Sequence, residues 1–217
     1  MTIAPPAETN APAEPLDVAA LVRAATADDH RNAESRGFIT RLMGGELSLG
    51  DYTRYLAQFG WVYEALEERG ARPGDAAVFD PALARLAAIE SDLAALGAAD
   101  WRETHPPLVA TAAYAAHLRA ISDDDVRYLA HHYTRYLGDL SGGQAIARLV
   151  ARHYGATADQ LRFYDFDLGD EGVVRYKRRY REAMNALALR PDQVDVLIEE
   201  ARASFRLNGA IFEALAA

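Results

Sequence analysis

The chain of 217 residues contains no cysteine. This absence excludes disulfides, thiolate metal ligands and cysteine nucleophiles. The chain also has no apolar run close to the roughly 20 residues that span a bilayer. Its first 15 residues lack the basic start and apolar centre of a signal peptide. We therefore expect a cytoplasmic protein without a membrane partner, since disulfide-free chains suit a reducing compartment.

Positive charge and β-branched residues are also scarce. The chain has 23 Lys and Arg against 32 Asp and Glu, a net charge of −9, with no basic tail or stripe. This balance argues against a nucleic-acid partner. Ala, Leu, Arg and Glu dominate, which favours an all-α fold. We expect a single domain over residues 16–217, preceded by a disordered Ala/Pro-rich tail over residues 1–15.

The most informative stretch is YTRYLGDLSGGQ at 133–144. Apolar residues at spacings of three and four on both sides of it predict one long central helix. Gly138, Gly142 and Gly143 each cost that helix about 0.8–1 kcal/mol relative to alanine. Without Cβ atoms the backbone can bend and approach a flat or bulky ligand, with Asp139 beside it. The alternative interpretations are that the small residues allow close helix–helix packing, or that they mark the end of one helix and the start of another.

Capping and breaking residues delimit the other predicted helices. Ser48 suits the start of a helix over 49–69, and Asp80-Pro81 suits one ending near 97. Residues 101–104 are expected to form a connector, residues 107–119 a short helix, and the chain after Pro191 the last helix. The central helix is expected to start after Ser122 or Asp123 and to end at Gly155.

Histidines supply the candidate iron ligands. His30 and Glu34 lie four residues apart, on one face of a first helix predicted over 16–36. A neutral imidazole is a good axial ligand for iron, and a carboxylate can fix its orientation. From spacing alone, an exposed pair that stabilises the helix is the simpler interpretation. His131 and His132 point to different helix faces, and we interpret both as packing or surface residues.

The only concentrated positive charge is RYKRRYR at 175–181. Lys177 and Arg181 share a helix face. The segment is either a solvated helix surface or a clamp for carboxylates or phosphates. The aromatic and acidic residues 163–172 before it are predicted to form a loop, to which we assign no function.

Several of these segments together resemble the haem oxygenase family, in order and at compatible spacings from about residue 16 to residue 215. The run at 133–144 is similar to the family signature. Ala25-Thr26, His30 and Ala33-Glu34 resemble its proximal-histidine segment. YEALE at 63–67 resembles the second helix, residues 176–185 the helix that faces the haem propionates, and residues 205–212 the closing helix.

The resemblance implies an all-α domain that holds haem b, as both substrate and cofactor, between a proximal and a kinked distal helix. His30 would be the axial iron ligand, oriented by Glu34. Gly138 and Gly142 would let the distal backbone approach the iron. Asp139 would hold a water network that delivers a proton to bound O₂. The other residues that the resemblance brings to the cofactor or the distal network are Thr26, Tyr133, Arg135, Gly143, Phe205 and Asn208.

Lys177 and Arg181 match the family positions that bind the haem propionates. Arg23 matches a third such position, at which lysine is frequent in relatives. Tyr133 would add a hydrogen bond to a propionate. These contacts would set the rotation of the haem, and we expect attack at the alpha meso carbon.

The family reaction uses three O₂ and reducing equivalents to yield biliverdin, CO and ferrous iron. The implied electron donor is a ferredoxin with its reductase or a flavoprotein reductase, attracted by the basic face, and a monomer is the simplest expectation. A non-degrading haem carrier is the alternative function, but it would have no need of Asp139. A relative of the same fold with another ligand would leave His30 unexplained.

Overall fold

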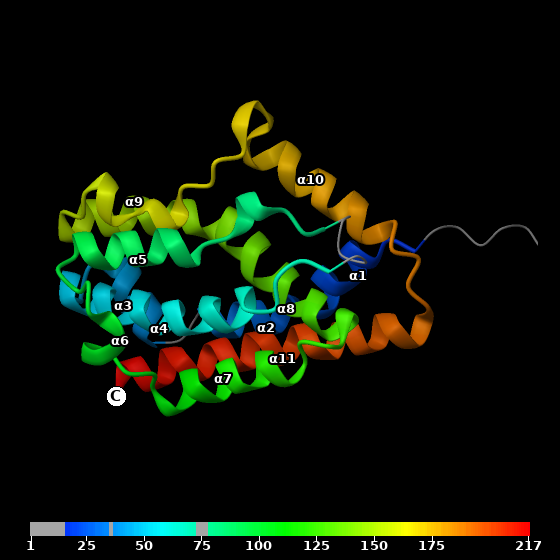
Figure 1. Ribbon diagram of the computed structural model, residues 1–217, viewed down its shortest axis with the longest axis horizontal. Coiled ribbons are helices and arrows are strands. Elements are labelled where there is room, and N and C mark those ends of the chain that lie inside the picture. Colours follow the sequence, from blue (N-terminus) through cyan, green and yellow to red (C-terminus); the bar gives the residue numbers. More distant parts are fainter. Residues whose placement is uncertain (1–15, 35–36, 73–77) are drawn as a thin grey trace, which may run out of the picture.

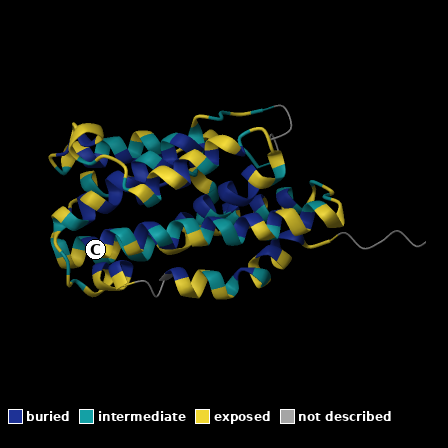
Figure 2. Cartoon of the chain, turned by 90° about the horizontal axis from the view of Figure 1, so that it is seen from below, coloured by how far each residue is buried: buried dark blue, intermediate teal, exposed yellow. Residues whose placement is uncertain are grey.

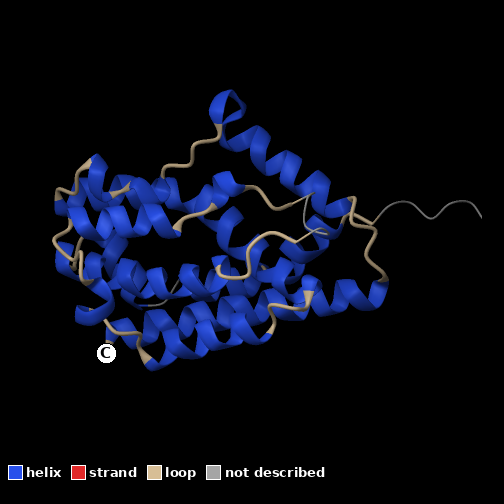
Figure 3. Ribbon diagram, viewed as in Figure 1, coloured by secondary structure: helices blue, strands red, loops and turns tan. Residues whose placement is uncertain are grey.

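The computed structural model describes residues 16–34, 37–72 and 78–217. Every regular element in these ranges is helical, which confirms the predicted all-α fold (Figure 3). The tail expected to be disordered, residues 1–15, lies outside the described residues. No helix in the described ranges is long and apolar enough to cross a bilayer.

The α-helices of the described ranges are labelled in Figure 1. In chain order they are α1 Val18–Ala25, α2 Ala27–Glu34, α3 Gly37–Gly44, α4 Leu49–Glu67, α5 Leu86–Ala95, α6 Trp101–Thr104, α7 Val109–Ala120, α8 Asp125–Gly138, α9 Gln144–Tyr154, α10 Gly172–Asn185 and α11 Pro191–Ala216. Short 3₁₀ turns are η1 Pro81–Leu83, η3 Ala158–Gln160, η4 Arg162–Tyr164 and η5 Gly169–Glu171, and a π-helical turn is η2 Asp139–Gly143.

Helix α11 forms the centre of the packing. It contacts α8, α7, α2, α3 and α1, while α4 packs against α5 and α7. Buried residues line the inward faces of these helices, and exposed residues line their outer faces (Figure 2). Because α11 touches both α2 and α8, it connects the predicted proximal and distal parts of the chain.

Helix starts follow the capping residues closely. Ser48 accepts a hydrogen bond from the Asp51 backbone in a full capping box at the start of α4, as predicted. Asp80 caps Pro81, but the helix expected there divides into η1 and α5. Residues 101–104 form the short helix α6 and not a connector. The cap of α8 is Asp124, next to the two residues predicted.

The first predicted helix divides at Thr26. The Thr26 hydroxyl donates to the carbonyl oxygen of Val22 at 2.8 Å, and α1 ends there with its C-cap. This side chain competes with the helical backbone for the carbonyl, which favours a break. Helix α2 then carries His30, and the expected end at residue 36 lies outside the described residues. Gly37, the residue that follows the predicted range 16–36, is the first residue of α3.

The predicted central helix is present but changes direction. Helix α8 passes into the π-helical turn η2 and then into α9, which ends at Gly155 in the left-handed conformation, φ +70°. Figure 1 shows that α8 and α9 run in different directions. A π turn inserts an extra residue into the helical ladder and is a recognised cause of a kink. The kink therefore falls on the glycine-rich stretch.

Candidate functional site

The carboxyl group of Asp139 is the centre of a buried polar network. The Tyr63 hydroxyl donates to its Oδ2, and Arg135 Nη2 donates to its Oδ1 at 3.2 Å. The other terminal nitrogen of Arg135 donates to Asn208 Oδ1 at 3.1 Å. The guanidinium lies 4.5 Å above the ring of Phe59. Residues from α4, from the kinked distal helix and from α11 thus fix the position of one carboxyl group.

Burial makes Asp139 a weak acid. Desolvation raises the pKa of Asp139 well above its ordinary value, even though Arg135 lies beside it. The carboxyl group can therefore hold a proton at a pH where an exposed aspartate has lost it. Arg135 Nε is buried without a hydrogen-bond partner among the described residues. A buried donor of this kind suits an added ligand or a water molecule.

The three glycines of the kink have two different surroundings. A Cβ atom at Gly138 or Gly142 would meet no atom within 4 Å, and both residues are exposed. A Cβ at Gly143 would lie 2.8 Å from Tyr164 Cδ1. Gly138 and Gly142 leave open space over the backbone, whereas Gly143 permits tight packing. The contact between Gly143 and the cofactor stays a prediction.

His30 lies on the proximal helix α2 and is exposed. Its ring meets the ring of Phe205 edge to face, with centroids 5.5 Å apart. Arg202 on α11 donates to the carbonyl oxygen of Ala25 and pairs with Asp29 at 3.8 Å, which holds the start of α2 on α11. The side chain of Glu34 lies outside the described residues, so its orienting role stays a prediction.

Helix α11 brings the two predicted halves of the site together. Phe205 contacts the predicted iron ligand His30, and Asn208, three residues further on, bonds Arg135 of the distal network. Residues three apart are neighbours on a helix surface. The proximal and distal residues are therefore anchored to one turn of the same helix.

The predicted cations also lie close together. Tyr133 is buried, which raises the pKa of its hydroxyl, while a hydrogen bond from Arg181 and the charge of Arg23 oppose that rise. Lys177 Nζ donates to Ser141 Oγ at 3.1 Å, beside Gly142. A cavity of about 590 Å³ between α1 and α10 is lined in part by Arg23 and Arg181. The structure thus assembles α1, α8 and α10 around one basic edge.

The remainder of the basic segment is partly neutralised. Arg179 pairs with Glu171 at 3.0 Å and with Asp80 at 3.4 Å, and Arg178 pairs with Glu182 at 3.6 Å. Glu171 belongs to the aromatic and acidic stretch 163–172, to which the sequence analysis assigns no function. Its carboxylate joins η5 to Arg179 on the neighbouring helix α10, while Asp80 before η1 pairs with Arg179 and accepts a hydrogen bond from Tyr176.

Sequence reasoning missed the residues behind the distal helix. Asp92, fully buried on α5, accepts hydrogen bonds from the backbone N–H groups of Arg162 and Phe163, both at 2.8 Å. Burial raises the pKa of Asp92 to about 6, although these hydrogen bonds oppose it. The segment held in this way places Phe163 against Tyr63, with ring centroids 5.5 Å apart, and Tyr164 against Gly143. The aromatic content of residues 163–166 was the one signal for this support.

His131 and His132 are both buried, in agreement with the packing interpretation. His132 Nδ1 lies 2.7 Å from the Tyr180 hydroxyl. His131 Nε2 lies 2.9 Å from Glu200 Oε1. Both rings are therefore held by partners on other helices.

Comparisons with known proteins point in one direction. A family model described as "Heme oxygenase" matches residues 16–214. "Heme oxygenase 1" of Gallus gallus is 36% identical over 214 residues, which cover 95% of this chain and 72% of that protein. "Heme oxygenase 1" of Nostoc sp. is 33% identical over 201 residues, which cover 89% of this chain and 84% of that protein.

Solved structures agree. Heme oxygenase-1 from the cyanobacterium Synechocystis, in complex with heme, superimposes with a TM-score of 0.85 at 30% identity and covers 92% of each chain. Heme oxygenase from Leptospira interrogans superimposes with a TM-score of 0.85 at 33% identity, and the match covers 92% of this chain and 100% of that one. These similarities span the same residues that carry the distal, proximal and basic groups.

Proposed function

The chain belongs to the haem oxygenase family, and from this premise we propose which of its residues carry out the reaction. The enzyme degrades haem with O₂ and reducing equivalents to biliverdin, CO and ferrous iron. Haem supplies the iron that activates O₂ and is also the macrocycle that is cleaved. The protein supplies binding, orientation and proton control.

The residues present fit a haem group. A Cβ atom at Gly138 or Gly142 would point into open space. Because both residues lack that atom, a flat macrocycle has room to lie against the distal backbone. His30 is exposed on α2, and an imidazole is a common axial ligand of haem iron. Haem propionates are carboxylates, and Lys177, Arg181 and Arg23 would hold them at the basic edge. One Arg135 nitrogen is also available to a water molecule.

The observation that carries the assignment is the buried carboxyl of Asp139 beside the two open glycines. Its raised pKa lets Oδ1 or Oδ2 hold a proton, and Arg135 and Tyr63 hold both oxygens in place. A positioned acid of this kind can deliver a proton through water to a ligand over the glycines. A carrier would need no such group, which argues against the alternative function.

The basic edge would determine which meso carbon is attacked. Arg181 and Arg23 lie near Tyr133 on the distal helix, and Lys177 reaches Ser141 beside the open glycines. Cations on α1 and α10, with Tyr133 on α8, would hold the two propionates in one rotation. That rotation is expected to present the alpha meso carbon, giving the IX-alpha isomer of biliverdin. Chromatography of the product isomers tests this, and a beta or delta isomer as the main product would contradict it.

The deciding experiment is an absorbance time course of the haem-loaded protein in air, with a reductant and catalase. We expect loss of the haem band and growth of biliverdin absorption, with CO trapped by a globin. His30→Ala is expected to lose turnover and to regain part of it when imidazole is added. The control is His105→Ala. His105 is the C-cap of α6 and is not a predicted iron ligand, so this variant should behave as wild type.

Two results would overturn the assignment. Haem that stays intact through sustained reduction, also with a ferredoxin and its reductase as donor, would favour the carrier. A His30→Ala variant that binds haem but gains nothing from imidazole would remove His30 as the axial ligand.

The electron donor is an acidic protein, such as a ferredoxin or a flavoprotein reductase, that docks on the exposed side of α10. Arg179 and Arg178 are paired with acidic neighbours, so their charge is partly offset, whereas Arg175 on the same exposed face has no ion pair among the described residues. Complementary charge raises the association rate and makes it depend on salt. Cytoplasmic location and a monomeric state stay predictions from the sequence.

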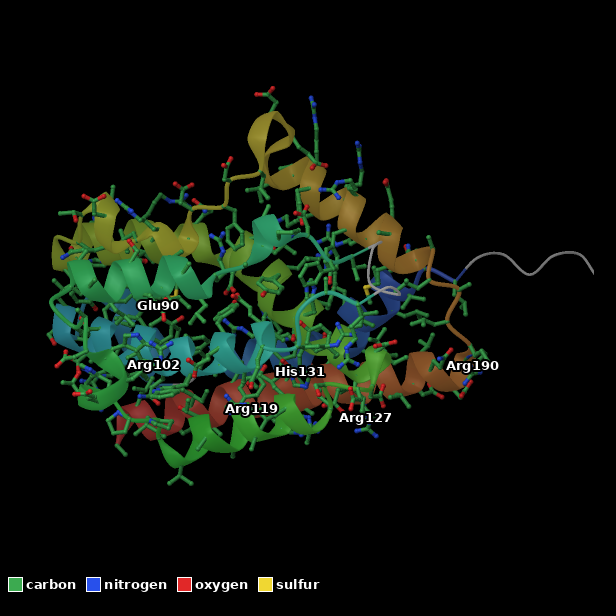
Figure 4. The ribbon with its side chains drawn as sticks, in the orientation of Figure 1. Glu90, Arg102, Arg119, Arg127, His131 and Arg190 are labelled. Carbon is green, nitrogen blue, oxygen red and sulfur yellow. The ribbon has the colours of Figure 1, made fainter. Side chains whose placement is uncertain are left out.

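Charge reversal tests the docking face. Arg175→Glu is expected to raise the KM for ferredoxin several-fold and to weaken its dependence on ionic strength, with little change in haem affinity. Arg119→Glu, on α7 at the opposite edge of the molecule in Figure 4, reverses the same charge as a matched control. Equal KM values for the two variants and wild type would contradict docking on α10.

A further inference from the structure

Three helices bring a second cluster of metal-ligating side chains together. His117 on α7, His131 on α8 and Glu200 on α11 offer ligand atoms that all lie within 4.8 Å of one another. Both Nε2 atoms face the same carboxylate oxygen, Glu200 Oε1, which lies 2.9 Å from His131 and within hydrogen-bond reach of His117. Figure 4 shows His131 on the part of α8 that lies over α11.

The atoms of these residues that point away from the cluster are held by other side chains. His131 Nδ1 lies 3.1 Å from the Tyr114 hydroxyl, which in turn lies 2.8 Å from Ser204 Oγ. Arg127 Nη1 donates to Glu200 Oε2 at 3.0 Å, which turns Oε1 toward the histidines. Partners of this kind fix the orientation of metal ligands and are typical of built metal sites.

The cluster directs one carboxylate and two imidazoles at the same point. In the metal-free chain both Nε2 atoms lie within hydrogen-bond distance of Glu200 Oε1. A bound ion would replace these two hydrogen bonds and displace their protons, as metal binding to imidazoles does. The charge of Arg127 opposes a cation, but Asp124, 3.2 Å from its Nε, offsets part of it.

We propose that His117, His131 and Glu200 form a site for a divalent zinc-class ion, separate from the haem iron. Two imidazole nitrogens and one carboxylate oxygen are a common ligand set for Zn²⁺, whose fourth position is taken by water. The side chain of His117 is 32% exposed while those of the other two are buried, so the ion enters past His117. Once bound, the ion links α7, α8 and α11 one turn before Arg135 of the distal network.

The test is calorimetric titration of Zn²⁺ into the full chain, haem-free and freed of metal with a chelator, at pH 7.5. We expect one equivalent to bind to the wild type. His117→Gln keeps a donor to Glu200 but loses an imidazole, and we expect it to weaken Zn²⁺ by more than about tenfold. His105→Gln removes a histidine outside the cluster and is the matched control, expected to keep wild-type affinity.

Two further arms identify the site and the ion. His30→Ala should keep the affinity, because the predicted haem ligand takes no part, and X-ray absorption of the zinc-loaded chain should show two imidazoles. Zn²⁺ should bind more tightly than Fe²⁺ measured without oxygen. Absence of saturable binding, or equal affinity of wild type and His117→Gln, would reduce the cluster to a hydrogen-bond network and overturn the proposal. Tighter binding of Fe²⁺ would overturn the choice of zinc.

Discussion

The two sides of the proposed haem site are built in different ways. On the distal side, Asp139 is buried and receives hydrogen bonds from Tyr63 and Arg135, with a third residue, Asn208, behind them. On the proximal side, His30 is exposed on an eight-residue helix, and its ring packs edge to face against the ring of Phe205. The distal polar groups thus have fixed partners in the haem-free chain.

The difference follows from what each side must do. Proton delivery depends on groups that are aimed in advance, since reorientation during the reaction costs free energy. Iron ligation requires one accessible imidazole nitrogen, which a short exposed helix can provide. We infer that the distal groups are oriented within the buried interior of the fold, whereas the proximal imidazole is presented at the surface, where iron can reach it.

The largest effect is expected at the distal carboxyl. Asp139→Ala removes the acceptor for Tyr63 and Arg135 and the group that can hold the proton. Because positioned acids contribute about 10²–10⁴-fold, biliverdin formation should fall by about 10²-fold or more. Haem affinity should change little, since the proximal side is untouched. The yield of biliverdin measures the first effect, and titration with haem measures the affinity. Asp192→Ala, which removes an exposed aspartate at the start of α11, is the control.

The second prediction concerns the support behind the distal helix. The pKa of Asp92 is about 6 in the folded chain, against an ordinary 3.8. The folded state therefore binds this proton more tightly than the unfolded state. The resulting stability is complete below pH 3.8 and is lost as the pH rises through 6. A shift of this size corresponds to about 3 kcal/mol.

Asp92→Asn removes the titrating group. The stability of wild type relative to this variant should fall by up to about 3 kcal/mol between pH 4 and pH 7. Urea unfolding at a series of pH values measures it. Parallel stability curves for the two proteins would mean that Asp92 does not titrate in this range.

A smaller loss is expected from Gly143→Ala. The new Cβ would lie 2.8 Å from a ring carbon of the buried Tyr164, whose segment Asp92 holds in place. Overpacking of this kind costs about 1–3 kcal/mol. Thermal or urea unfolding of the haem-free chain measures the loss. Rescue by Tyr164→Leu would show that the clash is the cause.

The sequence predicted the fold class, the helix starts at Ser48 and Pro191 and the kinked central helix, because capping residues and apolar spacing are local signals. It did not predict the division at Thr26, where the hydroxyl donates to the carbonyl oxygen of Val22, because the same bond at Thr53 and Thr134 leaves the helix unbroken and is therefore no local signal. Resemblance to a family gave the candidate residues, and the structure shows which of them meet.

Long-range pairing accounts for what the sequence missed. The bond between Tyr63 and Asp139 joins residues 76 apart, and that between Asp92 and Phe163 joins residues 71 apart. Spacing within one helix carries no information about such pairs. The three glycines of the kink form one motif in the sequence, yet Gly143 faces Tyr164 while Gly138 and Gly142 face open space. Only the packing of other elements distinguishes them.

The last prediction uses this distinction. Gly142→Ala adds a Cβ that meets no atom of the folded chain, so the haem-free protein should gain up to about 1 kcal/mol from better helix propensity. The same methyl group would stand where we propose that the macrocycle lies, so haem should bind more weakly. Gly143→Ala, one residue on, should show the opposite loss of stability. If Gly142→Ala binds haem as tightly as wild type, the open space above this glycine is not the haem face, and the contrast between the two sides of the site must be drawn elsewhere.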